Sequence, residues 1–377
     1  MAGTGGDHQG DGQGQEAMWG HEWVGAGDRI VQVLFRADYN LEPKENPDRL
    51  ARLRQWTESV LPVPMTGLEA ASADASFRRY FRASTSGASY IVMDAPPAHE
   101  DCGPFLHVAR LFRAAGANTP EILAENLAEG FLLLSDFGNT TYLMALNEAA
   151  ADDLYRDANA ALAKIQLASR AGELPEYDET LLRRELMLFP DWYITKHLKL
   201  DLADSQKQVM ESAFAAILAN NLAQPKVYVH RDWHSRNLMV TGRDNPGVLD
   251  FQDAVYGPIT YDLASIYKDA YIAWDEERVL DWVIRYWEAA RKAGLPVRAD
   301  FADFYRDFEW MGVQRHIKVL GIFARLFHRD GKEGYLKDMP LVMDYLRRAC
   351  QRYGELHPLL KLLDELAGKS AEVGYTF

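Results

Sequence analysis

The chain has 377 residues, of which 48% are hydrophobic and 25% charged, a composition typical of a soluble globular protein with a large core. Its formal net charge of -14 argues against a general binder of nucleic acid or anionic membrane. The two cysteines are too few for a disulfide scaffold or a zinc site, and no apolar run is long enough to cross a bilayer. We therefore expect a cytoplasmic protein that binds neither nucleic acid nor membrane.

The N-terminal segment carries few signals of folded structure. Nine of the first 28 residues are glycine, and such a segment cannot bury enough surface to offset its ordering entropy. A short β-like run at 30–35 is consistent with a strand or with an isolated segment outside the main domain. We predict a disordered extension over residues 1–47, after which Asp48 can cap a helix that runs through Val60.

The segment that follows alternates strand signals with one helix. Residues 77–82 and 89–93 are predicted strands, and the small-residue turn between them is a hairpin signal. A helix is predicted over 104–115, with a proline in its first turn and a glycine after its end. The apolar run 131–134 has the length of a strand, and Asp-Phe-Gly at 136–138 ends it.

The rest of the chain is mostly helical, apart from short β-like runs at 227–256. Amphipathic periodicity predicts helices near 150–170, 203–222, 277–293, 301–328 and 340–366. This order predicts an α+β, two-lobed protein-kinase-like fold. A small N-lobe with an antiparallel sheet and a preceding helix would occupy 48–137, and a mainly helical C-lobe with the catalytic loop would occupy 138–377.

One loop carries a pattern of chemically reactive residues. Residues 230–237 read His-Arg-Asp-Trp-His-Ser-Arg-Asn between two apolar runs, and Asp250 ends a third apolar run 13 residues after Asn237. Phosphoryl transfer requires a positioned acceptor hydroxyl, a bound metal and neutralised charge. Asp232 is suited to orient the hydroxyl and accept its proton, whereas Asn237 and Asp250 supply the oxygen ligands that Mg²⁺ prefers. The pattern predicts an ATP- and Mg²⁺-dependent phosphotransferase.

Three other residues of the loop are interpreted separately. We interpret His230 as a structural residue that fixes the loop by hydrogen bonds. His234 and Arg236 are consistent both with contacts to the substrate and with solvated positions in a loop.

At these residues the chain resembles the aminoglycoside phosphotransferase and choline kinase superfamily. Asp262, in the run Gly-Pro-Ile-Thr-Tyr-Asp-Leu-Ala-Ser at 257–265, matches an aspartate of that superfamily, which implies that it supports the catalytic loop.

A more extended resemblance covers about 68–345. It is carried by residues 72–82, 91–97, 131–138, 188–193 and 313–326. These segments are similar to the anomeric N-acetylmuramate/N-acetylglucosamine kinases of bacterial cell-wall recycling. The resemblance implies transfer of the ATP γ-phosphate to the C1 hydroxyl of an amino sugar.

The chain departs from the superfamily at one position. Met93 follows Tyr-Ile-Val where a kinase strand carries its phosphate-binding lysine. Arg78, Arg79 or Arg82 could replace that lysine, although alternate residues of a strand face opposite sides. Backbone N–H groups near Ser76 could also cradle phosphate. The expected ATP-binding residues are therefore Ser76, Arg78, Arg79, Met93, Leu134, Asp136 and Phe137, with adenine near the last three.

An amino-sugar pocket should mix aromatic and hydrogen-bonding side chains. Asp191, Trp192, His234 and Arg315 are candidates for it, and a lactyl carboxylate would favour arginine. Arg315 and Lys318 lie three residues apart, on roughly one face of a helix, but cations on helices are often only solvated, and Trp192 could equally belong to the core.

Two alternatives stay open. The acceptor could be an aminoglycoside, choline or homoserine, or the chain could be a non-catalytic pseudokinase, as Met93 suggests. Retention of Asp232, Asn237 and Asp250 argues against the pseudokinase. Protein kinase activity is disfavoured, because no Ala-Pro-Glu signature follows at the expected place.

Overall fold

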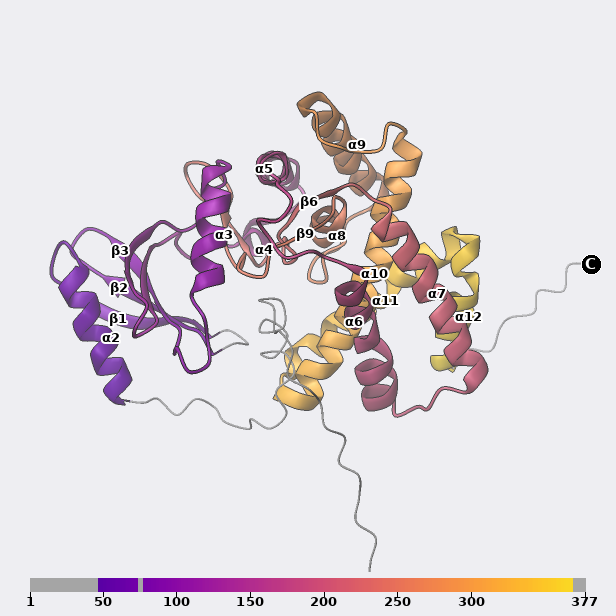
Figure 1. Ribbon diagram of the computed structural model, residues 1–377, viewed down its shortest axis with the longest axis horizontal. Helices are drawn as coiled ribbons and strands as arrows, with labels where there is room; N and C mark the ends of the chain where they lie inside the picture. Colours follow the sequence, from indigo (N-terminus) through magenta and orange to yellow (C-terminus); the bar gives the residue numbers. More distant parts are fainter. Residues whose placement is uncertain (1–46, 74–76, 369–377) are drawn as a thin grey trace, which may run out of the picture. The chain divides into compact units, whose positions relative to one another are not determined.

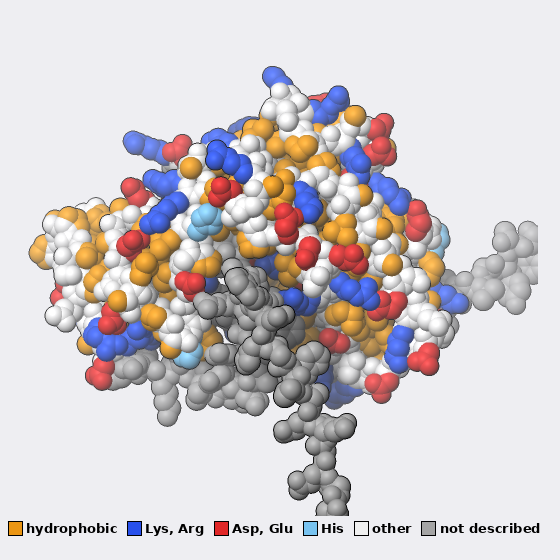
Figure 2. Space-filling view, in the orientation of Figure 1, with side chains coloured by type: hydrophobic (Ala, Val, Ile, Leu, Met, Phe, Trp, Pro, Cys, Tyr) orange, Lys and Arg blue, Asp and Glu red, His pale blue; other side chains and the backbone are white. Residues whose placement is uncertain are grey.

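The computed structural model describes residues 47–73 and 77–368 (Figure 1). The predicted extension at 1–47, its β-like run and Ser76 lie outside the described residues, apart from residue 47 itself. No helix among the described residues is both long enough and apolar enough to span a membrane. On the face drawn in Figure 2, acidic and basic side chains are interspersed.

The N-terminal part is an antiparallel sheet with the strand order β1-β2-β3-β5-β4. Its strands are β1 (Gly67–Ala73), β2 (Arg79–Ser84), β3 (Ser89–Asp94), β4 (Ile122–Asn126) and β5 (Phe131–Ser135). The predicted hairpin is confirmed as β2 and β3, and the predicted strand at 131–134 is confirmed as β5. The composition of β1 and β4 gave too weak a signal for either strand to be predicted.

Each face of this sheet is covered by one helix. Helix α2 (Pro47–Val60) packs through Leu53 against Phe81 and Val92, which point to one face of the sheet. Helix α3 (Gly103–Ala114) packs through Phe105 on the other face, in the cluster that contains Met93. Because neighbouring residues of a strand point to opposite faces, β2 and β3 serve both packing layers.

The C-terminal part is mainly helical, as predicted. Its helices are α4 (Tyr142–Ala145), α5 (Ala151–Leu167), α6 (Glu179–Leu188), the π-helix η1 (Phe189–Leu198), α7 (Asp204–Leu222), α8 (Tyr261–Tyr267), α9 (Glu276–Ala293), α10 (Phe301–Asp330), η2 (Glu333–Asp338), α11 (Met339–Arg352), η3 (Gly354–Leu356) and α12 (His357–Leu366). Helix α10 is central, because it contacts α6, α7, α8, α11 and η1. The stretch predicted as one helix at 340–366 is broken at Tyr353, whose backbone is extended.

Two short strand pairs frame the predicted catalytic loop. Strand β6 (Lys226–Val229) pairs with β9 (Val255–Pro258), and β7 (Leu238–Met239) pairs with β8 (Gly247–Val248). The loop 230–237 joins β6 to β7, and Asp250 follows β8.

Candidate active site

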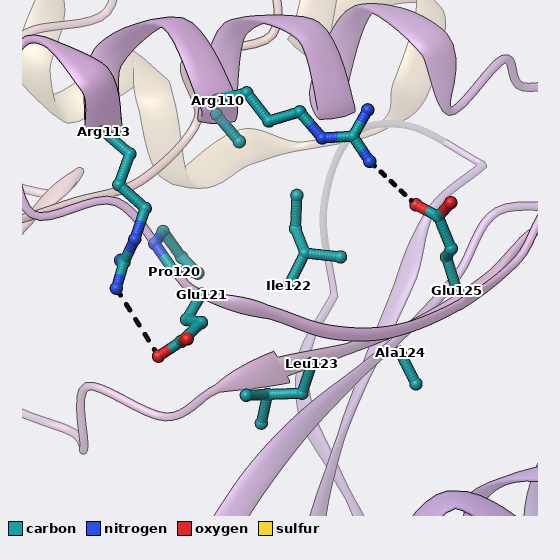
Figure 3. A pocket seen from close by; sticks show the side chains of 9 residues that line it. Arg110, Arg113, Pro120, Glu121, Ile122, Leu123, Ala124 and Glu125 are labelled. Atoms are coloured by element: carbon teal, nitrogen blue, oxygen red, sulfur yellow. Dashed lines mark hydrogen bonds and ion pairs between the residues drawn. The ribbon is translucent and has the colours of Figure 1, made fainter.

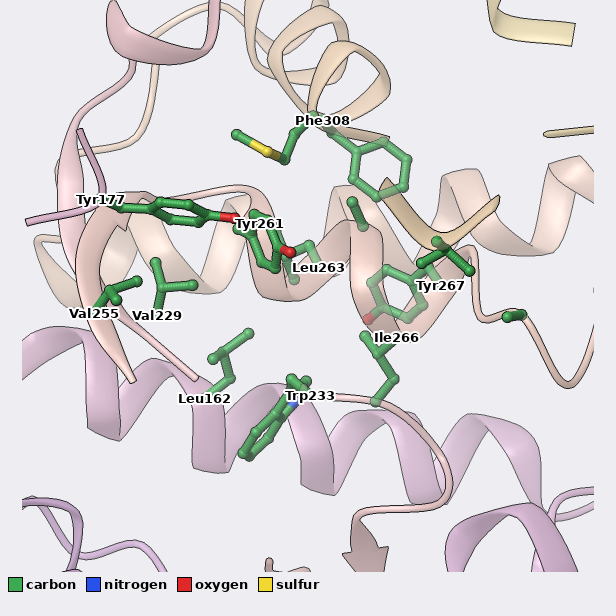
Figure 4. Packing of buried hydrophobic residues seen from close by; sticks show 14 of the residues in the cluster. Leu162, Tyr177, Val229, Trp233, Val255, Tyr261, Leu263, Ile266, Tyr267 and Phe308 are labelled. Atoms are coloured by element: carbon green, nitrogen blue, oxygen red, sulfur yellow. The ribbon is translucent and has the colours of Figure 1, made fainter. Parts of the chain in front are cut away.

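The loop is anchored in the core of the C-terminal part by its tryptophan. Trp233 is fully buried, and Figure 4 shows it within this core together with Leu162, Val229 and Ile266. The rings of Trp233 and His230 meet edge to face, with centroids 5.4 Å apart. Buried anchors on both sides of Asp232 therefore restrict where its carboxylate can point.

Asp262 holds the start of the loop. Its carboxylate accepts hydrogen bonds from the backbone N–H groups of His230, at 2.7 Å, and Arg231, at 3.0 Å. Arg231 has a φ of 77°, a left-handed conformation that is unfavourable for a residue other than glycine. The two hydrogen bonds compensate this strain. Burial raises the pKa of Asp262 to about 7, although both N–H groups act in the opposite direction.

His230 is fixed in one tautomer by two hydrogen bonds. Its Nε2 lies 3.0 Å from the carbonyl oxygen of Leu249 and therefore donates, while its Nδ1 accepts from the backbone N–H of Asp232 at 3.2 Å. Burial lowers the pKa of His230 to about 4, so the neutral ring persists at neutral pH. Through these contacts His230 links Asp232 to the segment after β8 that carries Asp250.

Asn237 and Asp250 lie side by side. The Nδ2 of Asn237 donates to the backbone oxygen of Asp232 at 3.0 Å and to Oδ2 of Asp250 at 3.2 Å, so Oδ1 is the atom of Asn237 suited to bind a metal. Gln252 donates to Oδ1 of Asp250 at 2.8 Å. Asp250 also has a left-handed backbone, with a φ of 61°. Strained residues with fixed side chains are characteristic of functional sites.

A buried ionic cluster lies behind Asp232. Glu185 of α6 pairs with Arg231 at 2.5 Å and with Lys318 of α10 at 2.9 Å, and Tyr177 donates to the same carboxylate. Burial would raise the pKa of Asp232, but the charge of Lys318 and then those of His234 and Arg231 outweigh it and lower that pKa. Asp232 is therefore ionised at neutral pH.

Arg78 and Arg79 lie on opposite faces of the N-terminal sheet. Arg79 pairs with Asp94 at 2.5 Å, beside Arg49 of α2, which contacts the same carboxylate at 2.6 Å. Its guanidinium also stands over the ring of Phe81, on the face that α2 covers. Arg78 is two residues from Tyr80, which packs with the cluster on the α3 face.

On the α3 face, Arg78 is held by Glu100. Its Nε lies 3.3 Å from Oε2 of Glu100, and these side chains are 12% and 3% exposed. Glu100 also accepts from the backbone N–H of Phe77 at 3.2 Å. Burial would lower the pKa of Arg78, but Tyr80, Glu100, Asp253 and Asp250 raise it. The guanidinium therefore lies within electrostatic reach of the proposed metal ligand Asp250.

The remaining residues expected near ATP have distinct environments. Met93 is fully buried against α3, and Leu134 is buried in β5. The carboxylate of Asp136 accepts two hydrogen bonds from Arg82, at 2.6 and 3.1 Å. The ring of Phe137 covers Gly247 so closely that an added Cβ there would lie 2.6 Å from the ring. Gly247 is therefore required for β8 to approach this segment.

The residues expected to contact the acceptor fall into two groups. Asp191 and Trp192 belong to η1, where Asp191 is exposed and Trp192 packs partly against the core. A π-helix is rare and frequently marks a functional site. His234 and Arg315 form the second group. Burial is the largest cause that lowers the pKa of His234, and the charge of Arg315 acts in the same direction.

The ring of Tyr271 packs beside His234 and is itself covered by Arg236. Tyr271 meets the His234 ring edge to face at 5.6 Å, and the guanidinium of Arg236 stacks 3.6 Å from the centre of the Tyr271 ring. Asp269 orders this region by accepting from the backbone N–H groups of Ser235 and Tyr271, at 2.9 and 3.1 Å.

Sequence reasoning assigned no role at the site to Glu100, Glu185 or Asp269. Each acts through a partner distant in sequence, so no local pattern reveals it. The only available signal was the charge of Glu100 directly before the predicted helix at 104–115.

A shallow pocket of about 360 Å³ lies between α3 and β4 (Figure 3). Ion pairs between Arg110 and Glu125, at 3.1 Å, and between Arg113 and Glu121, at 3.4 Å, span it. Its lining includes no residue of the loop 230–237, and its cations are already neutralised. We do not assign it to the active site.

Comparison with known proteins identifies the family. Residues 67–301 match the phosphotransferase enzyme family. The chain belongs to this family. It is 51% identical over 335 residues to an N-acetylmuramate/N-acetylglucosamine kinase of Neisseria meningitidis serogroup B, covering 87% of this chain and 99% of the relative. It is 47% identical to the protein of the same name from Pseudomonas putida, covering 85% and 98%.

Solved structures support the kinase-like fold that the sequence predicted. The choline kinase LicA from Streptococcus pneumoniae aligns with a TM-score of 0.57 at 12% identity, over 78% of this chain and 97% of that one. The ADP-bound aminoglycoside phosphotransferase APH(2'')-Ib aligns with a TM-score of 0.52 at 14% identity, over 78% and 97%. At these identities the likeness concerns the fold.

Proposed function

We propose that this chain is a cytoplasmic kinase that transfers the γ-phosphate of ATP to the anomeric C1 hydroxyl of N-acetylmuramate, N-acetylglucosamine or both. Phosphoryl transfer is supported by the arrangement of Asp232 and Asn237 on one strained, anchored loop and of Asp250 on the neighbouring segment after β8. The acceptor is supported by the relatives that carry this name at 47–51% identity.

Asp232 would act on the acceptor hydroxyl. Its lowered pKa makes it a carboxylate at neutral pH, so it can accept a hydrogen bond from the hydroxyl and orient the oxygen toward the γ-phosphate. Such a weak base takes the proton late, when the oxygen–phosphorus bond is already forming and the hydroxyl has become acidic. The product would be the sugar 1-phosphate and ADP.

Asn237 and Asp250 fit a Mg²⁺ site. Among residues 47–73 and 77–368, no group of three or more His, Cys, Asp or Glu side chains could hold a metal ion alone. One amide and one carboxylate suit Mg²⁺, which commonly takes few protein ligands and completes its shell with water and nucleotide phosphates. Bound there, the ion would neutralise charge on the phosphates.

Arg78 would take the role of the missing lysine. It is a buried cation held by Glu100, as a kinase lysine is held by a helix glutamate, and it lies within electrostatic reach of Asp250. Arg79 is already engaged with Asp94 on the opposite face, so it is the weaker candidate. We place adenine beside Leu134, Asp136 and Phe137, where the N-lobe (48–137) would meet the C-lobe (138–377).

A product assay tests this proposal. The protein is incubated with Mg²⁺-ATP and each sugar, and phosphorus and proton NMR locate the new phosphate. Phosphate on C1 is expected. Phosphate on C6 would refute the anomeric assignment. If the protein phosphorylated choline or an aminoglycoside but neither sugar, the proposed acceptor would be wrong, although the chain would still be a kinase.

A further inference from the structure

Arg315 is a buried arginine whose side chain makes no hydrogen bond or ion pair with the described residues. It lies on α10 and is 5% exposed, and its buried Nη1 has no hydrogen bond to any residue that the structure describes. Within residues 47–73 and 77–368, its guanidinium also forms no ion pair. Removing a guanidinium from water without pairing it is costly, so such a group is expected to be satisfied by a ligand.

The surroundings of Arg315 belong to the acceptor side of the loop. Its charge acts on His234, on Asp262 and on Tyr271, three groups that border or support the loop. The Nδ1 of His234 is a second buried polar atom without a hydrogen-bond partner among the described residues. Two unsatisfied buried groups on this side of the loop mark a place where a polar substrate group can bind.

The nearby cations are otherwise engaged. Lys318, one turn further along α10, pairs with Glu185 and donates to the hydroxyl of Tyr261 at 2.9 Å. Arg231 pairs with the same glutamate. Arg236 is exposed and stacks on Tyr271. Arg315 therefore stands out here as a buried cation whose charge no carboxylate in the described part of the chain contacts.

We propose that Arg315 binds the carboxylate of the acceptor, so that the site selects a hexosamine with an acidic ether substituent, N-acetylmuramate, over N-acetylglucosamine. This inference rests on the proposed function. A guanidinium presents two parallel N–H donors that match a carboxylate. In N-acetylmuramate the lactyl ether is on C3, close along the ring to C1, so a carboxylate receptor must lie near the catalytic base. Arg315 fits this requirement because it is buried with an unsatisfied Nη1 and its charge acts on His234, two residues after Asp232.

Steady-state kinetics with both sugars test the proposal. Arg315→Gln should raise KM for N-acetylmuramate roughly 10- to 100-fold, the effect of losing a charge-assisted pair. KM for N-acetylglucosamine and for ATP should change less than about twofold, because they do not use this pair. An equal rise in KM for both sugars would show an electrostatic or structural role of Arg315 instead. An unchanged KM for N-acetylmuramate would also overturn the proposal.

A substrate analogue provides a test without mutation. The methyl ester of N-acetylmuramate removes the charge of the lactyl group and adds only one methyl group. With the unmodified protein, KM for the ester should rise as it does for N-acetylmuramate with Arg315→Gln, and the variant should not distinguish acid from ester. If the unmodified protein has the same KM for the acid and the ester, no cation of the site binds the carboxylate.

Arg325 offers a matched control on the same helix. It is 4% exposed, and its buried Nε likewise has no hydrogen bond in the described part of the chain, but the charges that act on it are those of Arg329 and Asp330 rather than of loop residues. Arg325→Gln should leave the preference between the two sugars unchanged. If Arg325→Gln abolishes the preference and Arg315→Gln does not, the assignment to Arg315 is wrong. Failure of the unmodified protein to phosphorylate either sugar would refute the proposed function itself, a result distinct from all of these.

Discussion

Arg78 and Glu100 form a buried ion pair that joins the start of β2 to the segment before α3, with 3.3 Å between Nε and Oε2. The stacked rings of Phe77 and His99, 4.7 Å apart, reinforce the same junction. A cation bound in this way has a fixed position but also a compensating charge. It can therefore remain buried when no nucleotide is present, and phosphate oxygens can share it when ATP binds.

Replacing Arg78 should weaken the use of ATP. We expect Arg78→Gln to lower kcat/KM for ATP roughly 10- to 100-fold, because a charge-assisted contact to phosphate is lost. Glu100→Gln should have a smaller effect in the same direction, since the guanidinium stays but loses its anchor. Initial rates at varied ATP with saturating sugar measure both effects. Arg79→Gln is the matched control on the opposite face, and the assignment would be reversed if it alone impaired the use of ATP.

Asp250 and Asp232 should separate nucleotide binding from chemistry. We expect Asp250→Asn to lose the Mg²⁺-dependent rise in melting temperature caused by ATP, because one metal ligand becomes a neutral amide. Asp232→Asn should retain that thermal shift while kcat falls about 10²- to 10⁴-fold, the usual contribution of an acid–base group. Thermal shift with and without Mg²⁺, combined with turnover, distinguishes the two. Retention of the Mg²⁺-dependent shift in Asp250→Asn would remove Asp250 from the metal site.

The catalytic loop could be predicted from sequence because its information is local. His230, Asp232 and Asn237 fall within one short segment, and Asp250 follows at the end of a nearby apolar run, so spacing alone suggested their roles. The hairpin β2–β3 was predictable for the same reason. Strand β1, with the sequence Gly-Leu-Glu-Ala-Ala-Ser-Ala, has no apolar alternation. It forms because its backbone pairs with β2, a contact that is not local in sequence pattern.

The partners of these residues could not be predicted. Glu185 and Lys318 meet only because α6 and α10 pack together, which Gly321 permits: an added Cβ there would lie 2.4 Å from the backbone of Leu188. Sequence periodicity indicates which face of α10 is buried but not which helix covers it. For the same reason Arg315 and Lys318 looked equivalent, although Lys318 pairs with Glu185 and Arg315 forms no ion pair with the described residues.

The buried cluster around Glu185 should dominate the stability of the loop. We expect Glu185→Gln to lower the free energy of unfolding by about 3–5 kcal/mol, because Arg231 and Lys318 would remain buried without their counter-charge. Urea denaturation at pH 7 measures the change. Asp153→Asn, which removes a surface pair with Arg156 on α5, should cost less than about 1 kcal/mol. Equal costs for the two variants would mean that the cluster is well solvated.

His230 should make stability depend on pH. Burial lowers its pKa to about 4 in the folded protein, whereas the unfolded chain titrates near about 6.5. Between these values the unfolded state binds a proton that the folded state does not. The free energy of unfolding should therefore fall as pH drops from about 6.5 to about 4, and His230 should account for up to roughly 3 kcal/mol of this fall. Above about pH 6.5 its contribution should not change with pH.

His230→Gln isolates this contribution. Glutamine can still donate to Leu249 but does not titrate, so the stability deficit of the variant at pH 7 should shrink progressively toward pH 4. Asp262, whose pKa of about 7 gives the opposite slope, is present in both proteins and cancels in the difference. Urea denaturation at several pH values from 4.5 to 7.5 measures the difference. A constant deficit across this range would show that His230 titrates alike in the folded and unfolded chain, and the neutral tautomer that links Asp232 to Leu249 would then have to be abandoned.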